Sequence, residues 1–225
     1  MTDRLTLDHL VYGVPDLAMA MDEFEKQLGV APVFGGRHEG LGTHNAILPL
    51  TGETYLELIA SDPDGPEPGQ PRPFDLDALR SPRLVTWAVR SRAIEVDVEH
   101  AKEQGFDPGI VFGMTRKEPD GETLHWKLSL RREPFGDGLV PFVIDWGSTR
   151  HPSAVATKGA NADGQGPPTS RCEMSEFCAT HPDPIPIRAA LAALGAVLEV
   201  RDGPSAGLQI CLTGPAGSLQ LGETS

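Results

Sequence analysis

One pattern of strands and helices occurs twice in the first 150 residues, and this repeat is the feature that most limits the fold. A strand at residues 7–14 is followed by a helix at 16–28, and then by three strands at 32–36, 43–50 and 54–60. The same β-α-β-β-β order begins again at residue 84, after a spacing of about 75–85 residues. The repeat lies in element order and hydrophobic phasing, with little residue identity. It predicts an α+β fold built from two equivalent units.

The first predicted helix, at residues 16–28, is clearly defined by the sequence. Leu17, Met21, Phe24 and Leu28 recur at helical spacing, and charged residues occupy the other side. The preceding residue, Asp16, is a good N-cap, and a glycine follows the last apolar residue, where helices commonly end. We therefore expect an amphipathic helix that packs on the sheet.

Composition divides the chain into four segments. The first unit with a Pro-rich linker covers 1–73, the second unit covers 74–150, and a connector rich in small residues and proline covers 151–170. Residues 171–225 show a shortened β-α-β-β-β order. A piece of this size is marginal alone, so we expect it to pack on the first two units or on a second subunit.

Charge and cysteine content exclude several classes of protein. The formal net charge of −13 argues against a general surface for nucleic acid or anionic membranes. No apolar run approaches the roughly 18 residues of a membrane span, and the N-terminus lacks the pattern of a secretory signal. The three cysteines cannot all pair within one chain, and reduced cysteines in a cytoplasmic protein are the expectation.

His9 and Glu57 are the first candidates for chemistry, because each lies in the middle of an apolar strand. A buried carboxylate or imidazole is costly unless it has a partner. Three arrangements satisfy them: a metal ion, a cation beside the glutamate, or a direct pair between the two side chains. Such a pair is either purely structural or an acid–base couple.

Further candidates line the neighbouring strands. Side-chain alternation sends one of His44 and Asn45 inward and the other outward. His125 lies in the equivalent strand of the second unit. Trp87 and Trp146 either wall a binding site or fill the core.

Four motifs together resemble a known superfamily. They are Leu-Asp-His-Leu-Val-Tyr-Gly-Val at 7–14, Gly-Thr-His-Asn-Ala at 42–46, Tyr-Leu-Glu-Leu-Ile at 55–59 and Phe-Val-Ile-Asp-Trp-Gly at 142–147. In this combination the chain is similar to the vicinal oxygen chelate superfamily, in its branch of glyoxalase-like domain proteins. The resemblance implies that paired βαβββ units curl into a half-open barrel. It also implies a divalent metal ion, with one ligand from the first and one from the last strand of each unit.

Carried onto this sequence, the resemblance implies His9, Glu57 and Asp145 as metal ligands, with Leu84 at the fourth position. It implies His9 and Glu57 as catalytic residues, and the inward-facing candidates as contacts for a small-molecule substrate: His44, Asn45, His125, Trp87 and Trp146. The implied chemistry is that of an isomerase, a lyase or a dioxygenase-like enzyme acting on an oxygen-bearing organic molecule. A non-catalytic protein that binds or sequesters a small molecule is the alternative, and a homodimer fits either function.

Overall fold

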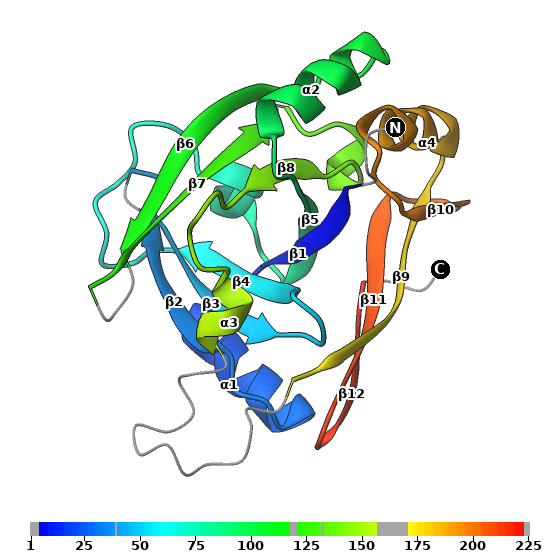
Figure 1. Cartoon of the computed structure of the whole chain (residues 1–225). Coiled ribbons are helices and arrows are strands. Elements are labelled where there is room, and N and C mark those ends of the chain that lie inside the picture. Colours follow the sequence, from blue (N-terminus) through cyan, green and yellow to red (C-terminus); the bar gives the residue numbers. More distant parts are fainter. Residues whose placement is uncertain (1–4, 39, 118–120, 132, 157–170, 223–225) are drawn as a thin grey trace.

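The computed structural model describes residues 5–38, 40–117, 121–131, 133–156 and 171–222. Eight strands form one closed barrel in the order β1-β4-β3-β2-β6-β7-β8-β5, and four more form a separate sheet (Figure 1). The predicted α+β class is confirmed, with a barrel built from two β-α-β-β-β units.

The first unit follows the predicted order. Its elements are β1 (Thr6–Gly13), α1 (Leu17–Leu28), β2 (Val33–His38), β3 (Thr43–Pro49) and β4 (Tyr55–Ser61). The Asp16 side chain accepts a hydrogen bond from the backbone of Met19, and Gly29 ends α1 in the left-handed conformation. The first and last strands, β1 and β4, pair in parallel.

The second unit repeats this arrangement. Its elements are the 3-10 helix η1 (Pro73–Ala78), β5 (Arg83–Arg90), α2 (Ile94–Glu103), β6 (Ile110–Lys117), β7 (Thr123–Leu130), the 3-10 helix η2 (Gly136–Gly138) and β8 (Phe142–Asp145). Its first and last strands, β5 and β8, again pair in parallel. A shift of 77 residues carries the bounds of β1 onto those of β5, and the start of α1 onto the start of α2.

Barrel closure differs from the half-open form expected from the sequence. Strand β2 meets β6 through a single registered pair, Arg37 with Lys117. Here β2 carries a bulge between Phe34 and Gly36. The bulge bends the strand and lets its end reach β6, which closes the sheet at a narrow seam.

The C-terminal segment has the predicted element order but a different pairing. After the short helix α3 (Pro152–Ala156) come β9 (Glu173–His181), α4 (Pro184–Leu194), β10 (Glu199–Asp202), β11 (Gly207–Gly214) and β12 (Gly217–Leu221). The sheet order is β10-β9-β11-β12. The first strand pairs in parallel with the next strand and not with the last, so this segment is not a third copy of the barrel unit.

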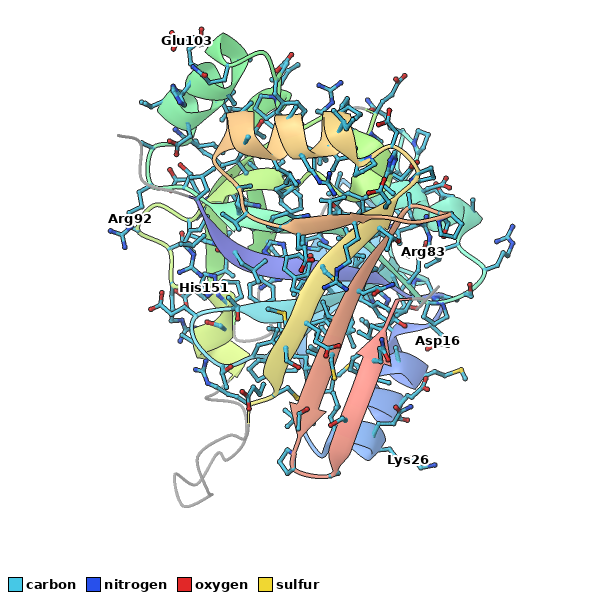
Figure 2. The ribbon with its side chains drawn as sticks, turned by 90° about the vertical axis from the view of Figure 1, so that its right-hand side faces the viewer. Asp16, Lys26, Arg83, Arg92, Glu103 and His151 are labelled. Atoms are coloured by element: carbon cyan, nitrogen blue, oxygen red, sulfur yellow. The ribbon has the colours of Figure 1, made fainter. Side chains whose placement is uncertain are left out.

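The barrel strands contribute to two hydrophobic cores, one on each face of the sheet. The inner core collects residues from the barrel strands, among them Val11, Ile47, Trp126 and Ile144. The outer core lies between the other face of the barrel, the three long helices and the C-terminal sheet. Figure 2 shows this sheet lying across one side of the molecule, between α4 and α1. Alternating strand residues supply the two cores in turn.

No helix in the described ranges is both long enough and apolar enough to cross a membrane. Most of the expected connector, residues 157–170, lies outside the part of the chain that the structure describes. The division into segments at residues 73, 150 and 170 stays a prediction.

Candidate functional site

A bulge in β1 places Asp8 and His9 side by side. Opposite them, β5 runs from Val89 directly to Ala88, so Asp8 has no registered partner. Two residues facing one bend the strand and redirect the extra side chain. Both side chains are consequently buried, with Asp8 0% and His9 3% exposed.

Glu57 faces His9 from the neighbouring strand β4. Its Oε2 lies 3.7 Å from His9 Nε2, and its Oε1 accepts a 2.5 Å hydrogen bond from Asn45 Nδ2. Glu57 as a whole is 8% exposed. One carboxylate oxygen is therefore held by an amide while the other is directed at an imidazole nitrogen.

The Asn45 amide is oriented by partners on both sides. Its Oδ1 accepts from Arg116 Nη1 at 3.1 Å, which leaves the two Nδ2 hydrogens for Glu57 and for His38 Nε2, 3.5 Å away. With Nε2 of His38 accepting, Nδ1 is the protonated nitrogen and donates to Thr43 Oγ1 at 2.9 Å. In this arrangement each hydrogen-bond donor of Asn45 and His38 faces an acceptor.

His38 is held as a neutral imidazole in this network. Burial lowers its pKa to about 4, and the nearby Arg116 and His44 charges add to that decrease while Glu57 opposes it. A neutral imidazole beside Asn45 can accept a hydrogen bond but adds no positive charge near the carboxylate.

Asp8 is the centre of a second polar cluster on the other side of His9. It accepts from His9 Nδ1 at 2.7 Å, Arg90 Nε at 2.7 Å and Trp146 Nε1 at 3.2 Å, and lies 3.1 Å from His151 Nε2. Burial alone would raise the pKa of Asp8, but hydrogen bonds from His151 and His9 and their charges bring it well below its usual range. Asp8 is therefore an ionised carboxylate at neutral pH.

Aromatic rings surround the His9–Glu57 pair. The Tyr55 ring stacks on His9 at 4.6 Å with planes 10° apart, and Phe142 meets His9 edge-on at 5.5 Å. Trp126 and Trp146 lie 5.3 Å apart in the same inner core. Burial, together with the Asp8 and Glu57 charges, raises the pKa of Tyr55 well above its usual range, so its phenol stays protonated.

The structure brings together only some of the residues expected from the sequence. His9, Asn45, Glu57 and Trp146 lie in or beside the two clusters. His44 and His125 alternate with inward residues and point away from the barrel interior; His44 is half-buried against Phe34, and His125 is exposed. Trp87 belongs to the outer core, where it contacts Phe177 and donates to the carbonyl of Leu139.

The second unit does not supply the other half of a four-ligand metal site. Asp145 points out of the barrel and accepts from the backbone of Gly147. The bulge at Asp8 recurs at Val85, and the 77-residue shift places Thr86, not Leu84, at the position of His9. The residue in the position of Glu57 is Phe142, since Val11 pairs with Glu57 and Ala88 with Phe142.

This donor set does not fit the expected divalent metal. Phenylalanine has no donor atom, and a neutral threonine hydroxyl is not among the usual ligands of zinc or related ions. Within the described ranges, His, Cys, Asp and Glu side chains form no group of three or more that could hold a metal ion.

Six polar residues of these clusters are not among the candidates that the sequence indicates: Asp8, His38, Thr43, Arg90, Arg116 and His151. Hydrophobic patterning places His38 and Arg116 in loops, but β2 and β6 extend further than their apolar runs. Asp8 carries one usable signal, since it is a charged residue within a continuous apolar strand. His151 follows the second unit, and no pattern marks it.

The sequence matches the glyoxalase-like domain family over residues 7–195. The chain therefore belongs to this family, and the match runs through both barrel units and α4. No curated protein matches the sequence.

The chain is also similar to solved structures. A hypothetical protein from Staphylococcus aureus has a TM-score of 0.62 at 14% identity, covering 97% of this chain and 85% of that one. Methylmalonyl-CoA epimerase from Mycobacterium tuberculosis is similar at a TM-score of 0.43 and 19% identity, over 64% of this chain and 91% of that one. The Streptomyces coelicolor enzyme of that name, bound to 2-nitronate-propionyl-CoA, gives 0.45 and 14%, over 65% and 100%.

Proposed function

We propose that this protein is a glyoxalase-like enzyme that moves a proton on a small oxygen-bearing organic molecule. The observation that carries the proposal is the buried Glu57 carboxylate, with Oε1 held by Asn45 and Oε2 facing His9 Nε2 at 3.7 Å. Two titratable groups in one buried site, each with a fixed orientation, are the arrangement that general acid–base catalysis needs. Isomerisation and elimination beside a carbonyl both begin with such a proton transfer.

In this proposal Glu57 is the base and His9 its partner. Glu57 Oε2 removes a proton from the carbon next to the substrate carbonyl, and Asn45 keeps the carboxylate in place. His9 Nε2 then takes up that proton from Glu57 and returns it to the substrate anion, which gives the neutral product. The Arg116 guanidinium, bonded to Asn45, supplies positive charge near the negative charge that develops on the substrate.

Entry of a substrate requires movement of aromatic side chains. Glu57 is 8% exposed, and rings of Tyr55, Phe142 and Trp146 occupy the surrounding space. The same rings exclude water once a ligand is bound, which strengthens the electrostatic interactions within the site.

The divalent metal expected from the family resemblance has no part in this mechanism. Only His9 and Glu57 stand at ligand positions, and Thr86 and Phe142 occupy the other two. The proton steps are therefore assigned to side chains of the chain itself.

Deuterium exchange into model substrates tests the proposal. A panel of 2-hydroxyketones and hemithioacetals of 2-oxoaldehydes is incubated with the protein in D₂O, and proton NMR follows the carbon next to the carbonyl. We expect exchange that falls about a hundredfold or more in Glu57→Gln, the contribution typical of a general base. Glu25→Gln, on the exposed face of α1, is the matched control. Exchange at the same rate in Glu57→Gln contradicts the proposal.

Non-catalytic binding of a small molecule is the second candidate. Its support is the apolar and aromatic second half of the barrel interior, with Val85, Trp126 and Phe142. Such a lining is typical of ligand sites. Thermal shifts induced by a ligand, with no exchange or turnover, favour binding alone. A cytoplasmic location and a homodimer stay predictions, and mass in solution tests the latter.

A further inference from the structure

Asp8 is a fully buried carboxylate that the proton chemistry above does not use. We propose that Asp8 is a positioning residue that fixes the orientation and protonated nitrogen of His9. Asp8 is itself held by three residues from other parts of the chain: Arg90, Trp146 and His151. This inference rests on the proposed function, since it gives Asp8 and His151 a part in the same reaction.

The contact between Asp8 and His9 determines which imidazole nitrogen is free. Asp8 Oδ1 lies 2.7 Å from His9 Nδ1, and an ionised carboxylate only accepts, so Nδ1 carries the hydrogen. The other nitrogen, Nε2, is then unprotonated and faces Glu57 Oε2 at 3.7 Å. His9 can take a proton at Nε2, and the neighbouring negative charge of Asp8 stabilises the imidazolium that forms.

The contacts of Asp8 define what this carboxylate does, since the Arg90 guanidinium lies 2.7 Å from Asp8 Oδ2 and keeps the group ionised. Because Asp8 stays ionised, it does not pass the proton onward. Its role is orientation and charge compensation, the part that the third member plays in a nucleophile–base–carboxylate arrangement.

His151 extends the site beyond the two barrel units. It follows β8 and comes directly before α3. Its Nε2 lies 3.1 Å from Asp8 Oδ2 and 2.8 Å from Arg90 Nη2, and its Nδ1 lies 2.8 Å from Ser153 Oγ in α3. These contacts tie the start of α3 to Asp8. Arg90 is anchored in turn by Glu53, at 2.8 Å.

If the cluster around Asp8 were purely structural, it would hold α3 against the barrel but would not determine which His9 nitrogen carries the hydrogen. The two roles therefore differ in one observable, the protonated nitrogen of His9. Correlation spectra of ¹⁵N-labelled full-length protein report this nitrogen directly, and His9→Gln identifies the signal.

The test compares Asp8→Asn and His151→Phe with the unaltered protein. In the unaltered protein we expect the His9 hydrogen on Nδ1. In Asp8→Asn we expect a mixture of the two forms, and a kcat for deuterium exchange lowered about a hundredfold with KM changed by about threefold or less. His151→Phe should lower kcat about tenfold, and His151→Gln, which keeps a polar tip, should restore part of it.

The controls separate failure of this inference from failure of the proposed function. His100→Phe, on the exposed side of α2, should change neither readout. If the protein catalyses no exchange, the NMR signal still decides: a changed His9 form supports positioning, and an unchanged form overturns it. If Asp8→Asn does not fold, the protonated nitrogen of His9 is determined in His151→Phe, and a changed or unchanged form is interpreted in the same way. Unchanged kcat together with an unchanged His9 form means that Asp8 is structural only.

Discussion

Asn45 controls the geometry of Glu57 through its single amide group. Its oxygen accepts from Arg116, and its nitrogen donates to Glu57 and faces His38. Because the amide cannot rotate without breaking these contacts, the carboxylate is fixed as well. The neighbouring His44 lies on the other face of β3, and its charge contributes to lowering the pKa of His38.

Asn45→Leu should therefore damage both activity and stability. The substitution keeps side-chain size but leaves buried partners without hydrogen bonds, which costs about 1–3 kcal/mol of unfolding free energy. We expect exchange activity to fall about tenfold or more, because Glu57 loses its orientation. Denaturant unfolding and the exchange assay measure the two effects. In His44→Leu, the matched control, activity should be retained; equal loss in both variants contradicts this account of Asn45.

His38 makes stability depend on pH in a defined window. Its folded pKa of about 4 lies below the ordinary 6.5, so the unfolded chain takes up the proton first as pH falls. The contribution of neutral His38 to the free energy of unfolding is complete above about pH 6.5. It is lost as the pH falls towards about 4. Asp8 acts in another window, because its lowered pKa costs stability only below about pH 4.

Unfolding free energies at pH 7 and pH 4.5 check this dependence. The His38 contribution to the free energy of unfolding should fall by about 2 kcal/mol between the two pH values, and His38→Gln should lack that part of the decrease. An equal decrease in the variant would show that His38 is not the buried neutral group described above.

At the scale of elements, alternation and capping carry most of the information in the sequence. The helix from Leu17 to Leu28 and the strand from Thr43 to Pro49 lie at the positions that the sequence predicts, because their periodicity and end signals agree. Alternation also indicates that His44 and Asn45 face opposite ways, but not which one faces inward. Hydrophobic phasing also aligns Leu84 with His9 in place of Thr86, because residues 84 and 86 share a face in a regular strand and a slip of two residues leaves the alternating pattern unchanged.

The seam between β2 and β6 depends on Gly36. This residue has a φ of +137°, and a Cβ there would lie 2.6 Å from the carbonyl oxygen of Lys117. Gly36→Ala should lower the free energy of unfolding by about 2 kcal/mol or more, because strain and collision act together. Gly113→Ala, on β6 with open space around its Cβ, should cost less than about 1 kcal/mol. Chemical denaturation measures the free energy of unfolding of both variants. Equal losses would show that the close approach at Gly36 is not important for stability.

At the scale of the whole molecule, the C-terminal segment is part of the barrel's outer core. Its helix α4 contacts α2, β11 contacts β5, and the backbone N–H of Ala216 donates to the carbonyl of Leu28. The family match extends through α4, which agrees with this packing. The sequence indicates that the segment must pack on something, but not its strand order, because short strands carry little information about their partners.

Leu212→Ala should destabilise the whole protein and not only the C-terminal sheet. Leu212 is 0% exposed in the outer core, so truncation should cost about 2–5 kcal/mol. Val197, 59% exposed, is the matched control, and Val197→Ala should stay within about 0.5 kcal/mol. Tryptophan fluorescence and circular dichroism should report one common transition for Leu212→Ala. Separate transitions would show that the C-terminal segment folds apart from the barrel.

The central claim is that Glu57 and His9 form an acid–base site that needs no metal ligand from the second unit. Deuterium exchange measured after dialysis against EDTA tests it most directly. We predict that the dialysed protein keeps its exchange rate within about twofold, and that Glu57→Gln loses about a hundredfold or more under the same conditions. Loss of exchange on chelation, with recovery on adding a divalent metal, would contradict the claim.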